Sequence, residues 1–127
     1  MTVIFFAGRG ILASLFILAG IDKITDPTTT IATMTDAGLP LPALLIVAVI
    51  AVELGGGLAV AVGLGRIGQV AAIALILHTL AVNVTLHPFW AVAPDIARTE
   101  LSLFFKNIAV IGGLMMVAAG AHTNAKS

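Results

Sequence analysis

The chain has 127 residues, of which 60% are hydrophobic and only 9% are charged, and its formal net charge is zero. A water-soluble domain of this length could not bury so large an apolar fraction, and a neutral chain has no basic surface to attract nucleic acid. Cysteine is absent, which excludes disulfides, iron–sulfur clusters and thiolate metal sites, and no residue spacing indicates any other metal site. The composition predicts an integral membrane protein whose first partner is the lipid bilayer.

The apolar residues are gathered into four runs, and about 20 residues of helix suffice to cross a hydrocarbon core ~30 Å thick. The predicted spans cover residues 3–23, 41–64, 67–86 and 100–120. The joint from Gly63 to Arg66 is so short that the second and third spans must be antiparallel neighbours. The sequence therefore predicts an all-α fold, a single-domain antiparallel bundle of four transmembrane helices.

The first run could also be read as a cleaved signal peptide. That reading would place basic residues before the apolar stretch, whereas residues 1–7 contain none. We therefore expect residues 3–23 to remain as a span.

A short helix is predicted between the first two spans. Asp26 can cap its beginning, Pro27 suits the first helical position, and Gly38 suits its exit. Ile31 and Met34 lie three residues apart and would form a small apolar face. We expect this helix to lie in the membrane interface without crossing it.

Residues 87–99 are predicted to form a loop at the membrane surface, because Pro88, Trp90 and Pro94 follow one another there. The basic residues do not decide the orientation. Arg66 and Lys126 fall on the side of the N-terminus, and two other basic residues fall opposite. We expect a multi-pass protein of the cell membrane with both termini in the cytoplasm.

Four residues that hydrocarbon penalises lie inside the predicted spans, one in each: Arg9, Glu53, His78 and Lys106. When depth in the membrane is counted from the ends of the predicted spans, the four residues fall within one layer, and Glu53 lies between Arg9 and Lys106. This arrangement predicts that Arg9 and Glu53 face each other. The cluster could exchange protons or bind a ligand, or it could only order the helices as an ion-paired core.

Two further patterns concern helix contacts. His78 is expected to bond to Asn107 or to a backbone carbonyl more readily than to haem or metal. Small residues repeat every four positions along the second span, which predicts close backbone contact along that stripe. The stripe consists of Ala51, Gly55, Ala59 and Gly63.

Several segments together resemble the DoxX family across essentially the whole chain. They are Arg9, Ala19-Gly20-Ile21-Asp22-Lys23, Gly38-Leu39-Pro40-Leu41-Pro42, Glu53-Leu54-Gly55-Gly56-Gly57 and Gly63-Leu64-Gly65-Arg66. The resemblance implies a DoxX-like domain of four membrane helices. It also implies a function linked to quinones, because the name-giving relatives are membrane subunits of archaeal quinone-linked sulfur-oxidising complexes. By matching position it marks Arg9, Lys23, Glu53 and Arg66.

The leading hypothesis is a membrane subunit of a redox or respiratory-type assembly, part of a quinone-linked oxidoreductase, that binds quinone or relays protons through the charged cluster. No motif for a resident cofactor is present, and the partners would be redox subunits or further copies of the chain. Two alternatives remain open. One is a small-anion or proton-coupled transporter or channel, and the other is a structural partner of other membrane proteins.

Overall fold

The structure is a computed structural model that describes residues 3–63 and 65–126, with side chains up to Gly120, so the side chain of Lys126 lies outside the described part. The helices are α1 (Val3–Thr25), α2 (Pro27–Asp36), α3 (Pro42–Val62), α4 (Arg66–Leu86), the 3₁₀ helix η1 (Phe89–Ala91) and α5 (Pro94–Lys126). Helices α1, α3, α4 and α5 are each long and apolar enough to cross a membrane. The predicted fold, four spans with a short helix between the first two, is confirmed.

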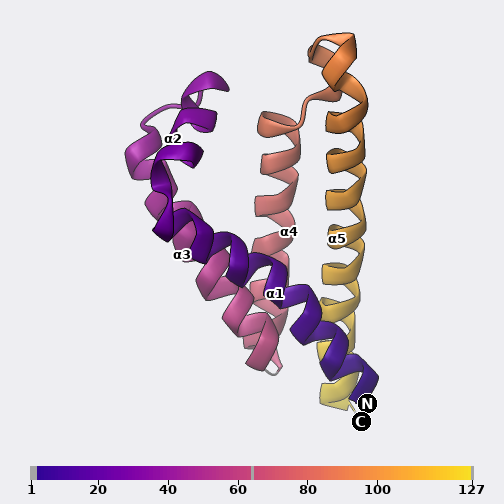
Figure 1. The fold of residues 1–127 in the computed structure, drawn as a ribbon. Helices are drawn as coiled ribbons and strands as arrows, with labels where there is room; N and C mark the ends of the chain where they lie inside the picture. The colour runs from indigo at the N-terminus through magenta and orange to yellow at the C-terminus, as the bar shows by residue number, and fades with distance from the viewer. Residues whose placement is uncertain (1–2, 64, 127) are drawn as a thin grey trace.

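The four long helices form two packed pairs, which α3 and α4 join (Figure 1). Helix α1 packs along α3, and α4 packs along α5, whereas α1 and α5 touch only slightly. The tight turn between α3 and α4 lies at the end of the bundle where both termini lie, and the pairs spread apart toward the opposite end, where α2 lies. We call these the terminal end and the α2 end.

The core lies where the two pairs meet. Ala13, Val60, Leu75 and Leu114, one from each long helix, are completely buried. Glycines let the helices approach closely: Gly57 faces the backbone of α1 at Ala13 and at the residue four positions later. The core therefore depends on small residues as much as on large apolar ones.

Only half of the predicted small-residue stripe on α3 is a contact surface, since Ala59 packs against the core and Gly63 is buried. Ala51 and Gly55 are exposed, and the close contacts are made by Gly56 and Gly57. The reason is that the Gly55-Gly56-Gly57 run offers three neighbouring faces of the helix. Gly56 packs against α4, and Gly57 packs against α1.

The predicted signals at both ends of α2 are confirmed. Oδ1 of Asp26 accepts a hydrogen bond from the backbone N–H of Thr29, and Pro27 occupies the first turn. Gly38 has a φ of 75°, and its N–H donates to the carbonyl of Thr35 as the helix ends. The apolar face of α2 packs toward α1 and α3, with its methionine, Met34, buried.

Helix α5 begins earlier than predicted. Residues 94–99 belong to it and not to the preceding loop, because Pro94 suits a first turn and the negative charge of Asp95 is favourable at a helix N-terminus. Four aromatic rings gather near this point in edge-to-face pairs whose centroids lie 5.1 to 5.8 Å apart. The rings belong to Phe89, Trp90, Phe104 and Phe105, and tryptophan is the type among them that is enriched at membrane interfaces.

The contacts of the glycines in α3 predict different effects on stability for two matched substitutions. In Gly57→Ala the new Cβ would lie 2.9 Å from Cγ1 of Ile17 and 3.3 Å from the carbonyl oxygen of Ala13, so α1 and α3 must separate. We expect a loss of about 1–3 kcal/mol in the free energy of unfolding. Gly55→Ala meets no atom within 4 Å, so it should be neutral or slightly stabilising. The free energies of unfolding of the two variants are measured in lipid nanodiscs. Equal losses in both variants would contradict the close packing of α1 against α3.

Candidate functional site

A buried carboxylate, Glu53, lies at the centre of the polar residues between α1, α3 and α4. The ammonium of Lys23 lies 3.1 Å from its Oε1 and 3.0 Å from its Oε2, and Nε2 of His78 lies 3.1 Å from Oε1. Glu53 is only 5% exposed, whereas Lys23 and His78 are partly buried. We call Lys23, Glu53 and His78 the Glu53 triad.

The hydrogen bonding of the triad is incomplete. Although Oε2 of Glu53 is within ion-pair distance of Lys23, the geometry of that contact is not that of a hydrogen bond, and Oε2 accepts none from the described residues. Oε2 is therefore held by the ion pair with Lys23 alone and keeps unused hydrogen-bond acceptor capacity.

The charge balance of the triad limits what it can do. If His78 is neutral, the negative charge of Glu53 and the positive charge of Lys23 cancel, and the triad carries no net charge. An added proton leaves a net charge of +1.

Two cavities meet at Glu53 and His78, which line both. The first, which we call the α2 cavity, lies between α2, α3 and α4 and measures about 300 Å³. Its polar lining is the Glu53 triad together with Thr30 and Thr85, and its apolar lining includes Met34 and Val49. This volume is at the lower end of the range for small-molecule sites.

The second cavity, which we call the α5 cavity, lies on the other side of the same two side chains. It measures about 200 Å³ and is lined by Glu53 and His78 together with residues of α1 and α5. Glu53 and His78 therefore form a polar partition between two small cavities.

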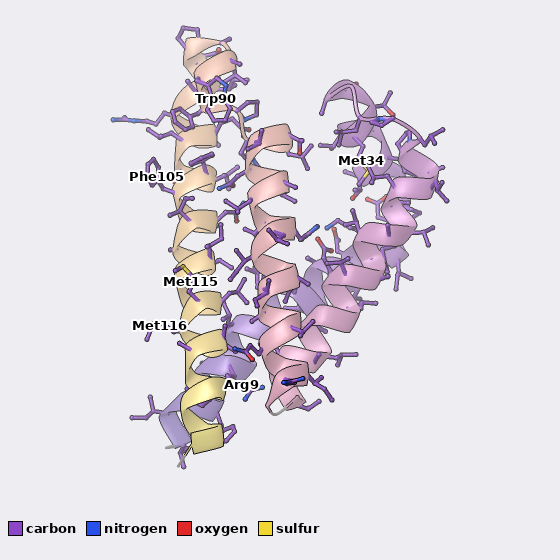
Figure 2. All side chains as sticks on the ribbon, turned by 180° about the vertical axis from the view of Figure 1, so that it is seen from behind. Arg9, Met34, Trp90, Phe105, Met115 and Met116 are labelled. Atoms are coloured by element: carbon purple, nitrogen blue, oxygen red, sulfur yellow. The ribbon has the colours of Figure 1, made fainter. Side chains whose placement is uncertain are left out.

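Arg9 does not belong to this site, and the prediction that it faces Glu53 is wrong. Its guanidinium donates to the backbone carbonyls of Val60, at 2.8 Å, and Gly63. These carbonyls lie at the C-terminal end of α3, where helices leave acceptors free and carry partial negative charge. Arg9 therefore closes the terminal end of the bundle, whereas Met34 and Trp90 lie at the α2 end (Figure 2).

The error comes from the register of α1 against α3. If the predicted spans 3–23 and 41–64 filled the same depth of membrane, Gly20 would lie opposite Val47. Gly20 instead lies against Leu54, about seven residues further along, an offset of about 10 Å at the helical rise. The offset moves Arg9 further from Glu53, from about the level of Leu58 to the end of α3, and it brings Lys23 to Glu53.

The remaining predicted site residues lie in different places. Lys106 is exposed on α5 and forms no ion pair with Glu53, so it does not join the expected charged cluster. Asn107 lines the α5 cavity, but it donates to Oδ1 of Asn83, at 2.9 Å, and not to His78. Arg66 is exposed at the beginning of α4.

Sequence reasoning missed two polar pairs. Nδ1 of His87 lies 2.7 Å from Oε2 of Glu100, and buried Asn83 links α4 to α5 through Asn107 and the carbonyl of Phe104. No local pattern marks either pair, because the partners come from different helices.

Sequence reasoning also missed Lys23 as the partner of Glu53. The available signal was the place of Lys23 in the family pattern. Its position at the end of a span looked like that of an ordinary interfacial lysine.

These features define a class: a four-span membrane protein with a buried acid–base triad beside a small cavity. A family model described as DoxX matches residues 4–88, and the chain belongs to the DoxX family. It is similar to the inner membrane protein YphA of Escherichia coli K12, with 27% identity over 116 residues that cover 91% of this chain and 81% of the relative. No solved structure matches the chain. All three triad residues lie within the segment that the family model matches.

The triad predicts energetic coupling between Lys23 and Glu53. Removing one partner leaves a buried charge alone, so Lys23→Met and Glu53→Gln should each destabilise the protein, and the double variant should be destabilised by less than their sum. We expect a coupling of about 1–3 kcal/mol in the free energy of unfolding, measured by a double-mutant cycle in nanodiscs.

The control cycle pairs Glu53→Gln with Arg9→Leu. These residues bind different groups, so their effects should add to within about 0.5 kcal/mol. Strong coupling of Arg9 to Glu53, or none between Lys23 and Glu53, would contradict the geometry.

Proposed function

We propose that this protein is a membrane subunit of a redox or respiratory-type assembly, in which the α2 cavity binds a quinone headgroup and the Glu53 triad exchanges a proton with it. The observation that carries the proposal is the buried, incompletely bonded Glu53 between Lys23 and His78 on the wall of that cavity.

The chemistry of the cavity fits such a headgroup. A quinone carbonyl accepts hydrogen bonds, and Lys23 supplies an ammonium donor at the cavity wall. Leu39, Leu45 and Val49 supply apolar surface for a flat ring. When bound, a quinone would supply the electron chemistry, for which this chain contains no motif of its own.

The proton balance of the triad supports the same proposal. Negative charge that develops on a bound carbonyl oxygen would favour a net charge of +1 on the triad. His78 can carry the added proton, and Oε1 of Glu53 would hold that proton in place. The triad would thus couple proton uptake to the arrival of negative charge.

A transporter or channel is less well supported. Between Arg9 at the terminal end and the triad lies a layer of completely buried apolar side chains, which includes Ala13, Val60 and Leu75. A hydrophilic path through one copy would have to cross this layer. Both cavities at Glu53 lie on one side of it, which favours binding over passage.

In this proposal the protein lies in the cell membrane with both termini in the cytoplasm, so that the α2 cavity lies in the outer half of the bilayer. The relative from Escherichia coli is described as an inner membrane protein, which supports the choice of membrane. Redox subunits or further copies of the chain would be its partners. Mass spectrometry of the gently extracted complex would identify them together with any bound quinone.

The test is equilibrium binding of a short-chain ubiquinone analogue to the protein in nanodiscs, measured by calorimetry. Lys23→Met removes the ammonium donor, and we expect the Kd to rise about 10- to 100-fold, which corresponds to one hydrogen bond to a charged group. Val49→Phe fills the cavity while keeping the triad, and it should weaken binding similarly.

The matched control is Lys106→Met, the same substitution on the exposed face of α5, which should leave the Kd unchanged. Melting temperatures distinguish impaired binding from impaired folding. Absence of binding to the unaltered protein, or equal Kd values for all variants, would refute the proposal.

A further inference from the structure

His87 and Glu100 form a second acid–base pair near the α2 end of the bundle. Nδ1 of His87 and Oε2 of Glu100 are 2.7 Å apart, and both side chains are 22% exposed. His87 follows the last residue of α4, and Glu100 lies in the second turn of α5. Both side chains are thus partly exposed, and the site described above does not use the pair.

The α5 cavity connects this pair to the triad. His87 lines it together with Glu53 and His78, and Thr79 and Asn107 add polar groups to the same wall. At about 200 Å³ it can hold several water molecules, since each needs roughly 10–15 Å³ of such volume and two to four polar partners.

We propose that His87 and Glu100 are the proton-uptake pair for Glu53, acting through water in the α5 cavity. This inference rests on the proposed function, because it names the route by which the triad is supplied with protons. The α2 cavity then holds the ligand, and the α5 cavity serves the proton.

The proton is conserved at each step. Glu100 or His87 takes a proton from the aqueous edge, and the pair passes one to water in the cavity. That water passes one to His78 or Glu53, and the pair returns to its starting state when it is protonated again. No electron moves, and no covalent bond other than those to hydrogen changes.

Other charged groups near the route come from each neighbouring helix. Lys23 on α1 is paired with Glu53, and Asp95 and Arg98 are exposed near the beginning of α5. Asp95 therefore offers a control: an acid at the same end of α5 that does not line the cavity.

The experiment is time-resolved infrared spectroscopy after a pH jump, on the full chain in nanodiscs without any quinone. The carboxyl band of Glu53 is assigned by its absence from Glu53→Gln. The double variant His87→Gln, Glu100→Gln should slow protonation of Glu53 at least about tenfold while leaving its final extent unchanged. Asp95→Asn should keep the original rate.

A second variant tests the same route without altering the pair, in case the double variant misfolds. Ala19→Leu narrows the α5 cavity from α1 and keeps the pair, and it should also slow protonation. Unchanged rates in both variants, or no change after the jump in either the carboxyl or the carboxylate bands of Glu53, would overturn the inference. Because no quinone is present, failure of quinone binding leaves this result intact, and the two proposals can fail separately.

Discussion

Hydrocarbon does not solvate charge, so a carboxylate buried in it must be bound by other side chains. The arrangement of α1, α3 and α4 at the α2 end follows from how Glu53 is bound. Its carboxylate lies near the middle of α3 and is almost completely buried. Lys23 reaches it from α1 and His78 from α4, so three helices converge on one acid. The pair of Lys23 and Glu53 cancels its own charge, which makes the burial tolerable.

The buried charges at the two ends of the bundle are stabilised in different ways. At the terminal end, Arg9 is buried and satisfied by backbone carbonyls of α3. At the α2 end the pairs of helices diverge, and the triad borders two cavities. Arg9 links α1 to α3 at the terminal end, and the proposed binding and proton exchange belong to the α2 end.

The sequence predicts the helices well, because runs of apolar residues and the capping signals at Asp26, Pro27 and Gly38 are local. It predicts the partners of the buried charges poorly. Register is set by packing at Gly20 and Gly57, and depth counted from the ends of the spans cannot capture an offset of about seven residues. The rotation of a helix is equally hard to predict: Lys106 lies inside a span, yet it is exposed, while its neighbour Asn107 faces the α5 cavity.

Glu53 is bound by Lys23 and not by Arg9, and the sequence allows a direct test because it contains only two glutamates, Glu53 and Glu100. The measurement is solid-state NMR in lipid bilayers, on protein with ¹⁵N-labelled lysine and ¹³C-labelled glutamate. It should show a short Lys–Glu distance that disappears in Glu53→Gln and persists in Glu100→Gln. The absence of that short distance would contradict the pairing. So would a short Arg–Glu distance, seen when arginine is labelled instead, that disappears in Glu53→Gln.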